Sequence, residues 1–171
     1  TVDGVATYDT VMLDGLNFEI YFSGITLSAD GTHYVIESVI IDAHYSYSDN
    51  RLYDAVIIYI PSKYDGLPVY AIGSIDYRFP VPDSCLKDGA TVKLIIGDGI
   101  KQIGETEYAG VDFMCGGINE LYIPASVEVV GEKALYKRCQ LTKVYCEATQ
   151  QPEGFAPDWI ADDVTVEWGA R

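Results

Sequence analysis

One short apolar pattern recurs along the chain, and this internal repeat limits the folds that the protein can adopt. Residues 94–97 (Leu-Ile-Ile-Gly) return as 121–124 (Leu-Tyr-Ile-Pro) and, in part, as 144–147 (Val-Tyr-Cys-Glu), after an earlier copy at 58–61 (Ile-Tyr-Ile-Pro). The copies start 36, 27 and 23 residues apart, and a weaker Val164-Thr165-Val166 follows 20 residues later. The last intervals fall in the range of about 20–29 residues that is typical of leucine-rich repeats. Because no such unit buries its own apolar edge, the units are expected to stack.

Within each unit the alternation predicts a short strand that points residues such as Leu94 and Ile96 inward. A second apolar pair follows, and a glycine closes it, where we expect a positive φ. These pairs and glycines are Val69/Ile72 with Gly73, Ile100/Ile103 with Gly104, and Val127/Val130 with Gly131. The short segments 108–109 and 134–136 come next and can form at most a turn or two of helix. The expected fold is therefore a β-rich (α/β-type) right-handed leucine-rich-repeat solenoid with short helical or 3-10 turns.

The two ends of the chain lack the clear repeat and are predicted to cap it, within a single domain of residues 1–171. Residues 1–54 contain an alternating run from Leu16 to Phe22 and a β-branched run from His33 to Ile41, which predict an N-terminal β meander. The repeats occupy 55–147. Residues 148–171 interrupt the pattern with prolines and offer three large aromatic side chains to cover the last unit: Phe155, Trp159 and Trp168.

The charge of the chain restricts its partners. There are 26 acidic and 11 basic residues, a net charge of −15, so binding to nucleic acid and to anionic membrane surfaces is not expected. No apolar run approaches the roughly 20 residues of a membrane helix, which predicts no membrane insertion. The sequence opens at Thr1 without the basic and apolar regions of a signal peptide, as a mature or excised chain would. We expect a soluble, monomeric, extracellular protein that favours neutral or basic partners.

Four cysteines bear on the core rather than on chemistry. Cys85, Cys115 and Cys139 end three successive repeats, and Cys146 occupies a strand position. There is no C-x-x-C pair and no neighbouring histidine, so we expect neither a metal site nor a cofactor. The three repeated cysteines are predicted to line the core as free thiols.

The repeat resembles the BspA-like leucine-rich repeats of bacterial surface proteins. That family's pattern runs approximately Leu-x-x-Ile-x-Ile-Pro-x-Ser-Val-x-x-Ile-Gly-x-x-Ala-Phe-x-x-Cys, and residues 121–135 follow it, with Val130 for Ile and Leu135 for Phe. The copy at 55–90 departs from it by a longer loop and by Tyr77-Arg78-Phe79 in place of Ala-Phe. The resemblance implies a secreted or cell-surface protein that binds or adheres rather than catalyses, and it supplies no catalytic residues.

The outward strand positions are the best candidate binding site. Aligned by repeat, they form one largely aromatic row and one partly charged row beside it. The first row is Tyr59, Ile95, Tyr122, Tyr145 and then Thr165, and the second is Ile57, Lys93, Glu120 and Lys143. Strand stacking alone produces such rows, and each cross-strand pair in them stabilises the sheet by about 0.2–1 kcal/mol. Exposed tyrosine clusters, however, are also enriched at interfaces.

Other arrangements suggest catalysis or ion binding less directly. Asp42, His44, Ser46 and Ser48 share one strand face, which is expected to be solvated rather than a catalytic triad. The acidic pairs Glu105/Glu107 and Asp162/Asp163 are expected by chance in so acidic a chain. The leading hypothesis is an extracellular module that binds a protein or glycan. A structural spacer or capping domain is second, and a glycoside hydrolase, which needs two facing carboxylates, is third.

Overall fold

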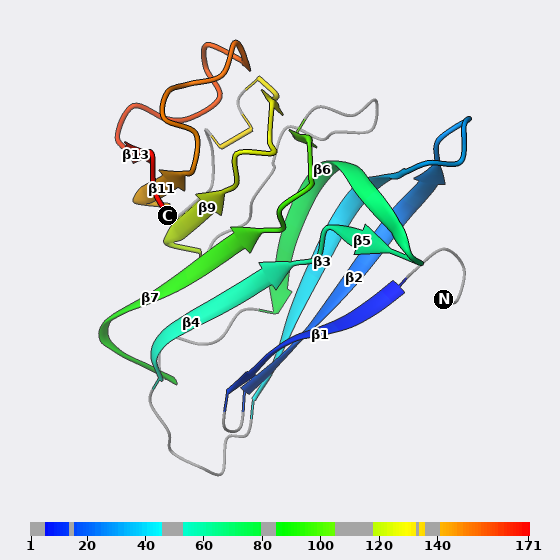
Figure 1. Ribbon diagram of the computed structural model, residues 1–171. Coiled ribbons are helices and arrows are strands. Elements are labelled where there is room, and N and C mark those ends of the chain that lie inside the picture. The colour runs from blue at the N-terminus through cyan, green and yellow to red at the C-terminus, as the bar shows by residue number, and fades with distance from the viewer. Residues whose placement is uncertain are drawn as a thin grey trace.

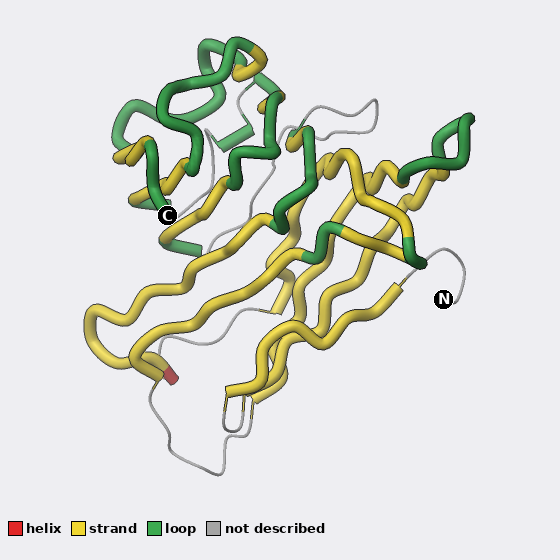
Figure 2. Tube along the Cα trace, in the orientation of Figure 1, coloured by secondary structure: helices red, strands yellow, loops and turns green. Residues whose placement is uncertain are grey.

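The computed structural model describes residues 6–13, 16–45, 53–79, 85–104, 118–132, 134–135 and 141–171. Over these residues the chain is almost entirely β-strand and loop, in two mostly parallel sheets that do not close into a barrel (Figures 1 and 2). One sheet has eight strands and the other has five.

The eight-stranded sheet begins with an antiparallel meander and continues as a parallel sheet. Its order is β1-β2-β3-β6-β8-β10-β12, with β5 pairing beside β6. The β1–β2 and β2–β3 pairs are antiparallel, whereas every pair from β3–β6 to β10–β12 is parallel. The strands are β1 (Ala6–Leu13), β2 (Leu16–Leu27), β3 (Tyr34–Tyr45), β5 (Lys63–Tyr64), β6 (Leu67–Phe79), β8 (Gln102–Ile103), β10 (Val129–Val130) and β12 (Gly154–Phe155).

The five-stranded sheet is parallel throughout, in the order β4-β7-β9-β11-β13. Its strands are β4 (Tyr53–Ile60), β7 (Leu86–Ile96), β9 (Glu120–Ile123), β11 (Lys143–Cys146) and β13 (Thr165–Trp168). From β4 onward the chain alternates between the sheets, and each return places a new strand beside the previous one. Each pair of successive strands, one from each sheet, therefore forms a layer on the layer before it.

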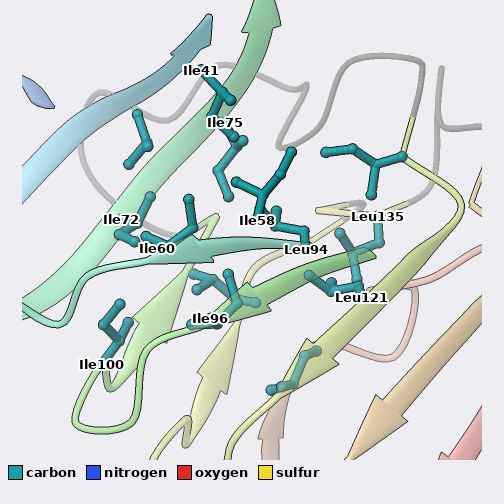
Figure 3. Close-up of a cluster of buried hydrophobic side chains, with 14 of the residues drawn as sticks. Ile41, Ile58, Ile60, Ile72, Ile75, Leu94, Ile96, Ile100, Leu121 and Leu135 are labelled. Carbon is teal, nitrogen blue, oxygen red and sulfur yellow. The ribbon is translucent and has the colours of Figure 1, made fainter. Parts of the chain in front are cut away.

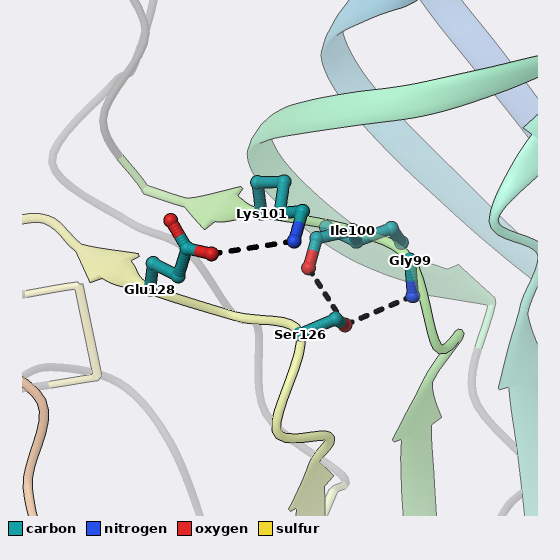
Figure 4. A network of polar contacts seen from close by, with 5 residues as sticks. All are labelled: Gly99, Ile100, Lys101, Ser126 and Glu128. Atoms are coloured by element: carbon teal, nitrogen blue, oxygen red, sulfur yellow. Dashed lines mark hydrogen bonds and ion pairs between the residues drawn. The ribbon is translucent and has the colours of Figure 1, made fainter.

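Polar contacts between equivalent positions hold the layers in register. The Ser126 hydroxyl accepts a hydrogen bond from the Gly99 amide and donates one to the Ile100 carbonyl, at 2.9 and 3.0 Å (Figure 4). Lys101 and Glu128 form an ion pair at 3.3 Å, again between residues 27 apart (Figure 4). The spacing of the sequence repeat is thus the spacing of the contacts.

The core lies between the two sheets, as alternation predicts. Leu94 and Ile96 are buried in one cluster with residues of the eight-stranded sheet such as Ile72 and Ile75 (Figure 3). The second apolar pairs of all three repeats are also buried, with exposures of at most 1%. The prediction of an inward row and a following apolar pair in each repeat is confirmed.

Several local predictions are wrong. Among the described residues a positive φ is found at Gly104 (74°) but not at Gly73 or Gly131, and Gly73 lies inside the extended strand β6. Residues 77–79, for which the repeat pattern made no prediction, belong to β6, because this strand pairs with β3 far beyond the length of a repeat strand. Leu135 forms a β-bridge with Ile160 rather than a helical turn. The remaining expected helical positions, 108–109 and Tyr136, lie outside the described residues.

The predicted N-terminal strands are present, and they share a sheet with the repeat strands. Ile20 and Phe22 of β2 are buried, as their alternation predicts. The turn between β2 and β3 is tied by Asp30, which accepts hydrogen bonds from the Ser28 and Thr32 hydroxyls at 2.7 Å. These bonds lower the pKa of Asp30 to about 2. The parallel pairing of β3 with β6 joins the meander to the repeats.

The C-terminal segment adds strands to both sheets and carries an aromatic cluster. β12 extends one sheet and β13 the other. Trp159 is 2% exposed and packs edge-to-face on Phe155, with ring centroids 5.0 Å apart. Trp168 is half-buried and lies 6.2 Å from Trp159.

The described cysteines carry free thiols. Cys146 is buried, and burial raises its pKa to about 12. Cys85 is partly buried against the core. Cys115 and Cys139 lie outside the described residues, so the prediction for them stays a prediction.

Candidate functional site

The register of the five-stranded sheet brings the predicted outward residues together on one face. Strands β4, β7, β9 and β11 alternate between buried and more accessible side chains, so residues two apart share the outer face. One cross-strand row is Tyr59–Ile95–Tyr122–Tyr145, and the row beside it is Ile57–Lys93–Glu120–Lys143. We call these eight residues the outward face.

The last strand corrects the alignment of the rows. Thr165 pairs with Lys143, and Glu167 pairs with Tyr145. Thr165 therefore ends the charged row rather than the aromatic row, and Glu167, which sequence reasoning missed, ends the aromatic row. Matching Val166 to Val144 would have given the correct register, because both side chains face inward in adjacent strands.

Exposure on the outward face is concentrated at its first strand. Tyr59 is 49% exposed and Ile57 is 38% exposed, and both belong to β4 at the edge of the sheet. Ile95, Tyr122 and Tyr145 are of intermediate burial because strands lie on both sides of them. The most accessible apolar part of the face is thus the β4 end.

Lysine side chains lie over the tyrosine rings of the other end. The Lys93 Nζ is 4.4 Å from the ring centroid of Tyr145 and 5.7 Å from that of Tyr122. The Lys143 Nζ is 4.5 Å from the Tyr145 centroid. Such cation–π contacts contribute roughly 0.5–1 kcal/mol each at exposed sites. The lysines and tyrosines of this face therefore form one packed array.

Three carboxylates, those of Glu167, Glu147 and Asp98, interact with members of this array. The Lys143 Nζ forms an ion pair with Glu167 at 2.8 Å, and this hydrogen bond is the main cause that raises the pKa of Lys143. Burial raises the pKa of Tyr122, and the negative charges of Glu147 and Asp98 raise it further. Glu147 also accepts a hydrogen bond from the Ala125 amide at 2.8 Å.

The turns after β7 and β11 place two of these acids, Asp98 and Glu147, at the carboxyl ends of the strands. Asp98 is exposed in the turn after β7. This turn packs on the preceding turn, because Gly97 lies directly against Ile60 and Ser62, and it hydrogen-bonds to the following turn through Gly99 and Ser126. Asp98 thus stands between the layers of Tyr59 and Tyr122.

At the opposite end of the strands, a residue that the sequence did not single out supports the face. The Asn119 side-chain oxygen accepts a hydrogen bond from the Val92 amide at 2.8 Å, and its carbonyl accepts one from the Thr142 amide at 2.8 Å. Asn119 therefore links three layers just before the lysine row. No repeated asparagine marks this position, so the sequence carried no signal for it.

The alternative sites gain little. Asp42 is buried rather than on a solvated face, and Ser46 and Ser48 lie outside the described residues, as do Glu105 and Glu107. Asp162 and Asp163 are exposed in the loop before β13. The described residues contain no group of three or more His, Cys, Asp or Glu placed to hold a metal.

No helix in the described part of the chain is long and apolar enough to cross a membrane.

Comparisons with protein-family models, with curated proteins and with solved structures gave no match to this chain.

Proposed function

We propose that the chain is a repeat solenoid of the BspA-like leucine-rich-repeat type and acts as an extracellular or cell-surface module that binds a protein or a glycan. The binding surface in this proposal is the outward face of the five-stranded sheet. No reaction is assigned to it.

The layered chain path supports the architectural part of this proposal. From β4 onward the chain adds one strand to each sheet in turn, and three polar contacts join residues 27 apart in the β7–β8 and β9–β10 layers. Stacked units that contact only their neighbours are the defining property of a solenoid.

The single observation that carries the binding part is the pair of exposed apolar side chains, Ile57 and Tyr59, at the β4 end of the outward face. Tyr59 continues there into the largely aromatic row of Ile95, Tyr122 and Tyr145. An apolar centre with charged residues along its edge has the composition of an interface core and rim. The lysines and Glu120 supply that edge. Aromatic side chains at such centres commonly contribute most of the binding free energy.

The test compares this pair with an equally exposed pair on the other sheet. The double variant Ile57→Ser/Tyr59→Ser removes the apolar end of the outward face. The matched control is Leu27→Ser/Tyr70→Ser, since Leu27 and Tyr70 are 48% and 36% exposed on β2 and β6. Both variants and the wild type are applied to a glycan array and to a panel of purified extracellular-matrix proteins.

We expect the outward-face variant to lose ligands that the wild type and the control retain, while all three unfold at similar temperatures. Equal retention by all three proteins, or no ligand for the wild type, would refute the proposed surface.

A structural spacer is a second candidate, and one observation favours it. The rings of Tyr122 and Tyr145 are already covered by Lys93 and Lys143, so this part of the row stabilises the sheet without any partner.

A further inference from the structure

The outward face divides into an occupied and an unoccupied half. The rings of Tyr122 and Tyr145 hold the lysine ammonium groups of the protein itself. Tyr59 has no ring contact and no cation over it among the described residues, and about half of its surface is exposed. The one tyrosine ring of this row that is free to receive a partner is therefore the ring on β4.

The charges around the row favour a cationic partner. Lys143 is neutralised by its ion pair with Glu167, and Lys93 is directed away from β4, over the rings of β9 and β11. Asp98 is exposed at the carboxyl end of the neighbouring strand, and Glu147 lies further along the same side. The whole chain carries a net charge of −15, which attracts cations from a distance.

The face also demonstrates the contact that such a partner would make. Each lysine over a tyrosine ring in the second half of the row is a cation–π contact built on the same strand position as Tyr59. An arginine or lysine over Tyr59 would repeat this geometry two or three layers earlier, with its aliphatic stem beside Ile57.

We propose that the partner is a protein with an extended, arginine- and lysine-rich segment, which docks at the β4 end of the outward face on Ile57, Tyr59 and Asp98. This inference rests on the proposed binding function and names the partner class for the same surface.

The test uses fluorescently labelled octa-arginine and octa-glutamate peptides, with fluorescence anisotropy at physiological ionic strength. We expect octa-arginine to bind the wild type at least tenfold more tightly than octa-glutamate. Tyr59→Ser should weaken octa-arginine binding about tenfold, as expected for an aromatic residue at the centre of a contact. Tyr59→Phe should keep most of the affinity, because the ring face is preserved.

Matched variants separate a site from general attraction to an acidic protein. Asp98→Asn should weaken octa-arginine binding about threefold, whereas Asp162→Asn, which removes the same charge from an exposed loop, should change it less than twofold. Tyr70→Ser, an exposed tyrosine on the other sheet, serves as the control for Tyr59→Ser. Equal effects of Asp98→Asn and Asp162→Asn, or of the two tyrosine variants, would overturn the inference.

Neutral chito- and malto-oligosaccharides distinguish this inference from the proposed function. If such a glycan binds the wild type and is lost in Tyr59→Ser while octa-arginine binding is unaffected, the basic partner is wrong and the binding face stands. If Ile57→Ser/Tyr59→Ser changes no interaction on the array or the panel, the proposed function fails as well.

Discussion

Replacing Gly97 by alanine tests how closely the layers are stacked. Gly97 follows β7 directly, and a Cβ built on it would lie 2.5 Å from the Ile60 carbonyl oxygen and 2.8 Å from the Ser62 amide nitrogen. Its φ lies outside the left-handed region, so alanine would suffer no backbone strain of that kind. The cost is therefore steric and falls between two layers.

The magnitude follows from what must move. The obstructing atoms are backbone atoms of the preceding layer, which cannot rotate away as a flexible side chain would. Relief requires the turn after β7 to withdraw from the turn after β4, at the expense of the β4–β7 pairing. Overpacking of this kind costs about 1–3 kcal/mol. At about 2–4 °C per kcal/mol for a chain of this length, the melting temperature should fall by roughly 2–12 °C.

Thermal unfolding followed by circular dichroism measures this change. Asp98→Ala is the matched control in the same turn, since Asp98 is exposed and such substitutions usually stay within about 0.5 kcal/mol. Gly154→Ala should repeat the effect in the other sheet, where a Cβ would lie 2.3 Å from the Glu128 carbonyl oxygen. A Gly97→Ala protein that melts with the wild type would refute the close stacking of the turns after β4 and β7.

Two further predictions concern the C-terminal segment and the thiols. Trp159→Ala should lower the free energy of unfolding by about 3–5 kcal/mol, and Trp168→Ala should lower it less, since Trp168 is only half-buried. A chain ending at Glu147 should be insoluble or lack near-ultraviolet circular dichroism, and a truncated chain that melts at the temperature of the wild type would contradict this. Thiol titration without reductant should find four free thiols after denaturation and an unreactive Cys146 in the native protein, and a lower total would contradict the free-thiol prediction. Folding raises the pKa of Cys146 to about 12, because the buried site favours the neutral thiol. The stability that this thiol contributes is therefore complete below the ordinary thiol pKa and is lost as the pH rises toward 12. Urea titrations at successive pH values should show a smaller alkaline decrease in the free energy of unfolding for Cys146→Ala than for the wild type.

The repeat strands and their inward rows could be predicted because their cause is local. Alternation of apolar and polar residues determines which side chains of β7, β9 and β11 face the core, and the sequence interval determines which strands lie side by side. Leu94, Leu121 and Val144 are therefore aligned in the sequence and paired in the structure. The outward face follows from the same two facts.

Other features depend on distant contacts and could not be predicted in this way. The extension of β6 to Phe79 depends on β3, a strand more than thirty residues earlier, and nothing within 67–79 signals that partner. Asp42 alternates as a solvated residue would, but it is buried, because alternation does not tell whether the second face of a strand is covered. A parallel pair between the meander and the repeats is a property of the whole chain path.

The outward face shows why a row of residues in a stacked fold is ambiguous evidence for binding. Any strand position that repeats will form a row, since the register of the sheet aligns it whether or not a partner exists. What differs along this row is the environment of each ring: Tyr145 is covered by two ammonium groups, whereas Tyr59 is covered by none among the described residues. A ring that the protein already occupies contributes to the free energy of folding, and a ring left half-exposed on an edge strand is available for the free energy of association. Substitution of Tyr145 should therefore lower the free energy of unfolding, whereas substitution of Tyr59 should weaken binding, although the sequence places both residues in the same row.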